Sequence, residues 1–296
     1  MTALTTAQLR AYQQISDPAS GRMLVIAMDQ RASMRNLIQV DSGEATHADL
    51  VRAKLDLVRY LGNEAPAVLL DPSTVVPQVI SDGILASDCA LMVGMDASGF
   101  DTDGRGLRVS RIVEGVDARR VRAVGGAAAK LNVYMRPDHE GLDAHPARMI
   151  ASVVEDCARE DVLLVVEILT YALADESPAD YKARAPELVV QAAAIARACG
   201  AQVMKLQYPG SLEACAAVTS ALGDIPWAVL SGGVDHATFL GHLRTALAGG
   251  ASGAIAGRSV WKDCLMADSE ATAARLREVA VPRLREIEAV LGEARA

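Results

Sequence analysis

Two lysines and one glutamate stand inside apolar runs of the sequence, where a charged side chain requires an explanation. Lys205 lies in AQVMKLQYPG, Lys130 in AAAKLNV and Glu167 in VLLVVEI. A buried ammonium group is costly unless it is paired or neutral. A desolvated amine near a second cation has a lowered pKa, and a neutral amine attacks a ketone to form a Schiff base. We therefore expect Lys205 to be the nucleophile, Lys130 the second cation and Glu167 a proton shuttle; the alternative is a Lys205 that snorkels to water at the rim.

Two glycine-rich turns form a second group of candidate residues. LSGGVD contains Ser231, Gly232 and Gly233, and AGRSV contains Gly257 and Arg258. Turns of this kind after the last two strands of a barrel hold phosphate through backbone N–H groups, and an arginine adds a bidentate charge. A glycine pair alone is also typical of a plain tight turn, so the nearby arginine carries the prediction of an anion site.

Polar residues also end the first two apolar runs. The first run ends in Asp29, with Gln30 and Arg31 directly after it, and the second ends in Asp71. For each residue taken alone, the alternative interpretation is a side chain exposed to solvent at the end of a strand, without a role in binding. Their shared position at strand ends favours a binding role, with Arg31 as a contact for a second anionic group.

Histidine and cysteine spacing gives no metal site. The five histidines show no H-x-H or H-E-x-x-H pattern, and the five cysteines are scattered without a C-x-x-C pair. Reduced thiols are the simplest interpretation. Asp101 and Asp103 open a pattern like that of a calcium loop, but the closing glutamate is missing, which indicates a turn. We expect no metal and no cofactor.

Eight short apolar runs position these residues, and segments with helical spacing separate them. The runs cover residues 23–29, 67–71, 89–94, 127–133, 162–168, 202–206, 226–231 and 252–257. Continuous apolar character is typical of parallel strands covered on both faces. The alternation predicts one (β/α)8 TIM barrel domain over 1–296, with a doubly wound open sheet as the alternative. The carboxyl ends of barrel strands form the active-site mouth, which is where the polar residues fall.

Caps and stops delimit the expected helices. Asp235 is placed to begin the helix in DHATFLGHLRTALAGG, and Gly249-Gly250 to end it. A helix over 185–200 has Pro186 in its first turn. Three further segments are expected: helices over 6–15 and 268–292, and a long loop or hairpin over 94–115.

Composition limits the partners of the protein. The 296 residues carry a net charge of −8, which argues against a nucleic-acid surface and requires a locally positive site for an anionic substrate. No run of ~18 uninterrupted apolar residues occurs, and the beginning of the sequence lacks the regions of a signal peptide. We predict a cytoplasmic protein that does not cross a membrane and that associates as a homo-oligomer.

The sequence resembles the class I aldolases that group tagatose-1,6-bisphosphate aldolase with sulfofructosephosphate aldolase. The resemblance extends over nearly the whole chain and rests on AMDQRASMR, LLDPSTVVP, AKLNVYMRPD, VVEILTY, PWAVLSGGVD and GGASGAIAGRSVW. Residues 226–284 are more similar to the sulfofructosephosphate branch, whereas DPSTVVP and ILTY are more similar to the tagatose branch. The fold implied is the same barrel.

The resemblance implies Schiff-base cleavage of a ketohexose 1-phosphate to dihydroxyacetone phosphate and a three-carbon aldehyde. Lys205 matches the imine-forming lysine, and Glu167 and Lys130 match charged residues of strands 5 and 4. The other matches surround the phosphate (Ser231, Gly232, Gly233, Gly257 and Arg258) or line the mouth (Asp29, Gln30, Arg31 and Asp71). Two positions depart from the family: Gln207 replaces a glutamate, and Ile168 replaces a frequent proline.

The substrate considered first is 6-deoxy-6-sulfofructose 1-phosphate, which would give 3-sulfolactaldehyde beside dihydroxyacetone phosphate. The alternative is a tagatose or fructose bisphosphate. They differ in the distal anion, because a sulfonate carries one negative charge and a phosphate nearly two at neutral pH. A third hypothesis, a sugar-phosphate-binding barrel without turnover, is opposed by the joint presence of Lys205, Lys130 and Glu167.

Overall fold

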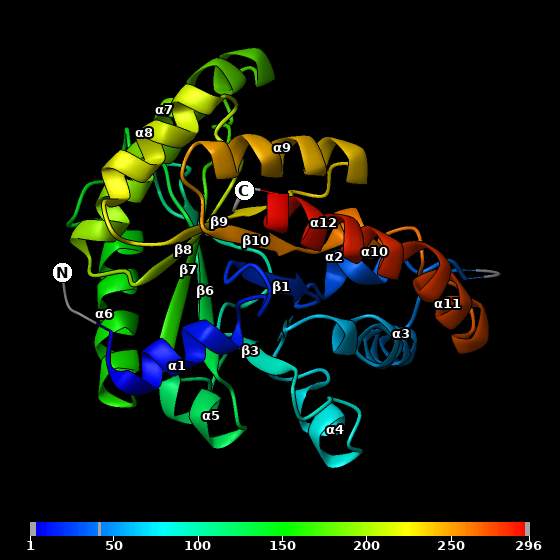
Figure 1. The fold of residues 1–296 in the computed structure, drawn as a ribbon. Helices are drawn as coiled ribbons and strands as arrows, with labels where there is room; N and C mark the ends of the chain where they lie inside the picture. The colour runs from blue at the N-terminus through cyan, green and yellow to red at the C-terminus, as the bar shows by residue number, and fades with distance from the viewer. Residues whose placement is uncertain (1–3, 41–42, 294–296) are drawn as a thin grey trace.

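Eight parallel strands close into a barrel in the computed structural model, which describes residues 4–40 and 43–293 (Figure 1). The order around the barrel is β1-β10-β9-β8-β7-β6-β3-β2, so every strand pairs with its neighbours in the sequence and β10 closes against β1. The strands are β1 (Met23–Ala27), β2 (Ala67–Leu70), β3 (Ala90–Gly94), β6 (Ala128–Tyr134), β7 (Leu163–Leu169), β8 (Val203–Leu206), β9 (Trp227–Leu230) and β10 (Gly253–Ala256). The predicted (β/α)8 barrel is confirmed, and the open sheet was the wrong alternative.

Helices alternate with the strands and surround the barrel (Figure 1). They are α1 (Thr6–Gln14), α2 (Ala32–Arg35), α3 (His47–Tyr60), α4 (Val76–Ser81), α5 (Ala118–Ala123), α6 (His145–Arg159), α7 (Pro178–Ala198), α8 (Leu212–Leu222), α9 (His236–Ala248), α10 (Arg258–Trp261), α11 (Ser269–Arg275) and α12 (Val281–Glu293), with a 3-10 turn at Gly62–Glu64 and a π-helical turn at Leu276–Ala280. Among the described residues, no helix combines the length and the apolar character that a membrane crossing requires.

The strands separate two apolar layers because successive side chains point to opposite faces. Outward-facing residues pack beneath the helices, and inward-facing ones fill the barrel. Helix α1 covers the amino-terminal end of the barrel, where Ala11 packs into the inward layer. Glu167 and Lys205 stand two residues after Val165 and Val203 of that layer. They therefore point into the barrel just above its apolar filling.

One expected helix begins earlier than predicted, and another is interrupted. Helix α7 begins at Pro178 and contains Pro186 in its interior, because Ser177 caps the helix by accepting the N–H of Asp180. A capping serine followed by proline is the stronger start signal. The expected helix over 268–292 is divided into α11 and α12 by the π-helical turn. The Asp235 cap and the end of α9 at Gly249 are confirmed.

The segment over 94–115 forms a hairpin after β3. A long loop or a hairpin was expected there. Its short strands are β4 (Asp101–Thr102) and β5 (Arg108–Val109), which pair antiparallel. The hairpin returns to the barrel through β5, which contacts β6. It therefore places residues of the insert near the carboxyl ends of the strands.

Gly253→Ala is expected to lower the midpoint of thermal unfolding, because Gly253 pairs with Met23 where the barrel closes. A Cβ atom at Gly253 would lie 2.1 Å from the Met23 carbonyl oxygen. Crowding of this kind in a packed interior costs about 1–3 kcal/mol, occasionally more. The control is Gly241→Ala on α9, where a Cβ meets open space and helix propensity rises. Equal midpoints for Gly253→Ala and the wild type in calorimetry would contradict this account of the closure.

Candidate active site

Charged side chains on β6, β7 and β8 form one buried cluster. Glu167 lies between the two lysines: its Oε2 atom is 2.7 Å from Lys130 Nζ and 3.0 Å from Lys205 Nζ. The strand register causes this arrangement, since Glu167 is paired directly with Lys205 on β8, and Lys130 with Val165 on β7. The side chains are 3–9% exposed, so the charges interact with little screening by water.

Lys130 is surrounded by carboxylates. Its Nζ atom lies 3.0 Å from Asp29 Oδ2 and 2.9 Å from Asp96 Oδ1, in addition to the contact with Glu167. Burial by itself would lower the pKa of Lys130, but the charges of Asp29, Asp96 and Glu167 raise that pKa well above its ordinary value. Lys130 is therefore a permanent cation and unsuited to act as a nucleophile.

The three carboxylates differ in how they hold protons. Burial opposes the ionisation of Asp29 and Glu167, but the charges of Lys130 and Lys205 outweigh it and lower the pKa of both groups. Burial, with added repulsion from Asp29 and Glu167, raises the pKa of Asp96 despite its contact with Lys130. Asp29 and Glu167 are thus ionised at neutral pH, and Asp96 accepts a proton more readily.

Asp96 was missed in the sequence because it begins the Gly- and Asp-rich insert. Its Oδ1 atom also accepts the backbone N–H of Asn132 at 3.0 Å. The sequence does contain a signal for Asp96: the apolar run of β1 ends in AMD (27–29), and that of β3 continues into the similar GMD (94–96). Extending the third strand to its carboxyl end places Asp96 at the mouth, as Asp29 was placed.

Two cavities meet at Lys205. One of about 510 Å³ is lined by the turn from Ser231 to Gly233 and by Arg258. The other, of about 350 Å³, is lined by Asp29 and Arg31. Both cavities reach Lys205 and Glu167. Among the described residues, Lys205 forms an ion pair only with Glu167. The amine of Lys205 is thus accessible from both cavities and has one carboxylate neighbour.

The structure brings together the two glycine-rich turns from which an anion site was predicted. The N–H of Gly257 donates to Ser231 Oγ at 3.3 Å, which links the turns after β9 and β10. Gly233 has φ of +83°, and a Cβ there would lie 3.2 Å from the Arg258 guanidinium. Glycine therefore permits the close approach of Arg258 to the turn. Within the described chain Arg258 has no carboxylate partner, which leaves its charge available to a ligand.

Asp29, Gln30 and Arg31 line the smaller cavity as a group. The Nε2 atom of Gln30 donates to Asp29 at 3.0 Å, and Arg31 donates to the carbonyl oxygen of Asp96 at 2.6 Å. Three buried atoms in this wall have no partner in the described structure: Gln30 Oε1, Arg31 Nε and Asn132 Oδ1. Buried polar atoms are normally hydrogen-bonded, so this wall is suited to a ligand rich in hydroxyl groups.

Asp71 is placed differently from the expectation. It lies outside the lining of both cavities, and its carboxylate pairs with the buried ammonium of Lys54 on α3. The turn after β2 directs it there, since Asp71 Oδ1 accepts the N–H of Thr74 at 2.8 Å. Lys54 also donates to the carbonyl oxygen of Met28 at 2.6 Å. Asp71 therefore supports the backbone at the end of β1.

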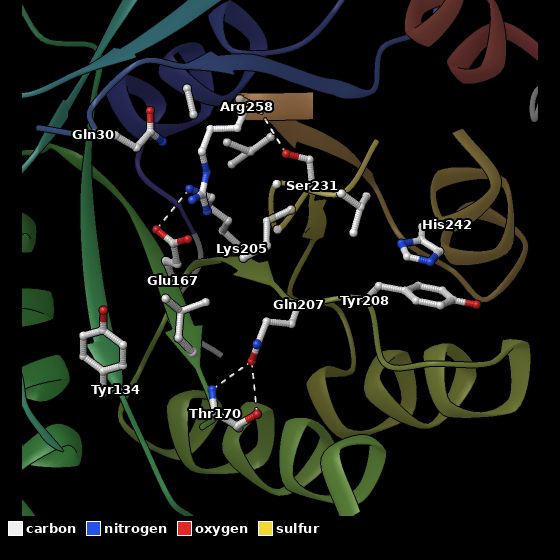
Figure 2. A pocket seen from close by; sticks show the side chains of 18 of the residues that line it. Gln30, Tyr134, Glu167, Thr170, Lys205, Gln207, Tyr208, Ser231, His242 and Arg258 are labelled. Atoms are coloured by element: carbon white, nitrogen blue, oxygen red, sulfur yellow. Dashed lines mark hydrogen bonds and ion pairs between the residues drawn. The ribbon is translucent and has the colours of Figure 1, made fainter. Parts of the chain in front are cut away.

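The departures from the family pattern have local explanations. Gln207 Oε1 accepts the N–H of Thr170 at 2.8 Å and its hydroxyl at 3.1 Å, as Figure 2 shows. A carboxylate oxygen can accept the same bonds, so glutamine keeps the link between β7 and β8 and removes one charge from the cavity wall. Ile168 faces outward and packs in the outer apolar layer.

Lys130→Met is expected to destabilise the protein at pH 7 by about 3–5 kcal/mol, because three buried carboxylates lose their counter-charge. Without the cation, their folded-state pKa values rise above those of the unfolded chain. Such groups cost stability at a pH above their unfolded pKa values, and the cost disappears as they become protonated. The difference from the wild type in urea unfolding should therefore narrow from pH 7 to pH 5. A difference that is independent of pH would contradict the charge assignment.

Comparisons with known proteins identify the family of the chain. The model of the DeoC/LacD family aldolases matches residues 23–263. Tagatose 1,6-diphosphate aldolase of Staphylococcus aureus (strain JH9) is 24% identical over 280 residues, covering 86% of this chain and 84% of that protein.

Solved structures share the fold. An archaeal fructose-1,6-bisphosphate aldolase, whose catalytic lysine is bound to a carbinolamine intermediate, has a TM-score of 0.66 at 18% identity and covers 96% of this chain and 99% of its own. Fructose-bisphosphate aldolase from Slackia heliotrinireducens DSM 20476 has a TM-score of 0.63 at 17% identity, with 99% and 93% covered. Since the family model extends over most of the barrel, the chain belongs to the DeoC/LacD family of aldolases.

Proposed function

We propose that this class I aldolase cleaves a ketohexose 1,6-bisphosphate of the tagatose or fructose type. The products are dihydroxyacetone phosphate and glyceraldehyde 3-phosphate, formed through a Schiff base on Lys205. The observation that carries the proposal is the contact of Lys205 with ionised Glu167 beside an anion site. In Figure 2 these two residues lie between Arg258 and Ser231 on one side and the Gln207 region on the other.

The choice of substrate follows the relatives. The aldolases compared above are named for tagatose 1,6-diphosphate and fructose 1,6-bisphosphate. These names favour the bisphosphate alternative over the sulfosugar that we considered first from the sequence. Binding without turnover is opposed by the direct contacts among Lys205, Glu167 and Lys130.

The reaction begins when the amine of Lys205 attacks the C2 carbonyl of the ketose. The amine must be neutral, and the carboxylate of Glu167, 3.0 Å away, can take its proton. The attack gives a carbinolamine. Glu167 then returns a proton to the carbinolamine hydroxyl, which leaves as water, and a protonated imine remains. Lys130 stays an ammonium throughout because of its three carboxylates.

Carbon–carbon cleavage follows from the electron demand of the imine. The electron pair of the C3–C4 bond moves to the imine and forms an enamine, while the C4 hydroxyl loses its proton and becomes an aldehyde. We assign that proton to Glu167, which is ionised and lies against the reacting amine. Protonation at C3 and hydrolysis of the imine release dihydroxyacetone phosphate and restore Lys205. Because the imine accepts the electrons, the proposed reaction needs no metal.

Two walls of the site would hold the substrate. The turn of Ser231 and Arg258 would bind the C1 phosphate. The unpartnered atoms of Gln30 and Asn132 would accept hydrogen bonds from sugar hydroxyl groups. A homo-oligomeric state and a cytoplasmic location stay predictions from the sequence.

Borohydride reduction in the presence of dihydroxyacetone phosphate is expected to label Lys205. Reduction converts the imine to a stable secondary amine, so peptide mapping by mass spectrometry locates the modified residue. Lys205→Met should remove the label, and in the wild type no label should appear on Lys130. Label on Lys130, or none on the wild type, would refute the proposed chemistry.

Tagatose or fructose 1,6-bisphosphate is expected to show a higher kcat/KM than 6-deoxy-6-sulfofructose 1-phosphate. A distal phosphate carries nearly twice the charge of a sulfonate and gains more from an arginine partner. Dihydroxyacetone phosphate is the common product, so one coupled assay serves for all three substrates. Incubation with a chelator should leave the rates unchanged. The opposite substrate order would restore the sulfosugar hypothesis, and loss of activity on chelation would indicate a metal.

A further inference from the structure

Arg108 lies on β5 of the hairpin that follows β3, and three aromatic rings hold its guanidinium. The guanidinium carbon is 4.2 Å from the ring centroid of Phe100, 4.4 Å from that of Tyr171 and 5.1 Å from that of Tyr134. The backbone N–H of Arg108 also donates to Tyr171 Oη at 2.8 Å. Contacts on several sides fix the position of a side chain that is otherwise flexible.

The charge of Arg108 is uncompensated. In the described parts of the chain its guanidinium has no carboxylate within ion-pair distance and no hydrogen-bond acceptor. By contrast, Arg105 and Arg111 of the same hairpin pair with Asp103 and Asp101. Aromatic faces attract a guanidinium but leave the in-plane N–H donors unused. Arg108 is therefore a positioned cation with its hydrogen-bonding capacity intact.

Arg108 also lines the larger cavity that contains Lys205 and Glu167. Tyr134, which contacts Arg108, lies on the far side of Glu167 from Ser231 in Figure 2. One cavity thus has Arg258 and the Ser231 turn toward one end, the reactive lysine within it, and a second unpaired arginine near the other end. This order matches a ketose that carries an anionic group at each end.

We propose that Arg108 binds the anionic group on the distal carbon of the substrate, while Arg258 holds the C1 phosphate. This inference rests on the proposed function and adds a specificity-determining residue to it. Arg108 offers two parallel N–H donors to a terminal phosphate or sulfonate. Arg31 is less available for this role, since it already donates to the Asp96 carbonyl oxygen at 2.6 Å and lines the smaller cavity.

The test compares fructose 1,6-bisphosphate with fructose 1-phosphate, which lacks the distal anion. Arg108→Met is expected to lower kcat/KM for the bisphosphate about 10- to 100-fold, the scale of a lost charged hydrogen bond. The kcat/KM of Arg108→Met for fructose 1-phosphate should stay within about twofold of the wild-type value, because that substrate has no distal anion for Arg108 to contact. The control is Arg105→Met, which removes the same charge from the hairpin and should change neither value.

Two further measurements separate the possible failures. Arg108→Lys keeps the positive charge but loses the planar pair of N–H donors, so it should reduce the preference for the bisphosphate over fructose 1-phosphate. This variant replaces Arg108→Met in the test if Arg108→Met does not fold. Binding of both sugars to Lys205→Met protein, by calorimetry, tests the contact without turnover. If the Arg108 variants lose kcat/KM and affinity equally for the two sugars, or lose neither, the proposed role of Arg108 is refuted. Failure to trap an imine on wild-type Lys205 refutes the proposed function separately, since that labelling needs no distal anion.

Discussion

The ammonium of Lys130 is the charge on which the rest of the site depends. Three carboxylates from the ends of β1, β3 and β7 converge on it, at 2.7–3.0 Å. Without that cation, Asp29, Asp96 and Glu167 would repel one another in a region of low dielectric. With it, strands on different sides of the barrel are joined at the mouth, and Glu167 stays ionised where it touches Lys205. The same ion cluster therefore links the strands of the barrel and keeps the proposed base, Glu167, ionised.

An acidic protein can still bind a doubly anionic sugar when its positive charges are local. The net charge is −8, yet neither Arg258 nor Arg108 has a carboxylate partner within the described chain. The charges of Lys130 and Lys205, in contrast, are balanced by neighbouring carboxylates. Positive charge is thus removed from the centre of the cavity and left at its ends. In the proposed reaction, that distribution would align a long substrate with its carbonyl carbon at Lys205.

The sequence predicted the barrel and its three central charged residues because parallel strands have a strong pattern and fixed geometry. Continuous apolar runs define the strands, and strand parity places Lys130, Glu167 and Lys205 inside. Contacts that depend on loops were beyond such reasoning. Arg108 belongs to an insert without periodicity, and the direction of Asp71 is set by one turn. These side chains are positioned by tertiary contacts that no local pattern records.

Three buried lysines show why burial alone does not identify a nucleophile. Burial lowers the pKa of Lys54, as it would for a reactive amine, but Lys54 is paired with Asp71 and lines neither cavity. Lys130 reaches a cavity but is held as an ammonium by three carboxylates. Only Lys205, of these three, faces both cavities with a single carboxylate that can take its proton. Access to substrate and a route for the proton, rather than desolvation itself, distinguish Lys205 as the proposed imine-forming lysine.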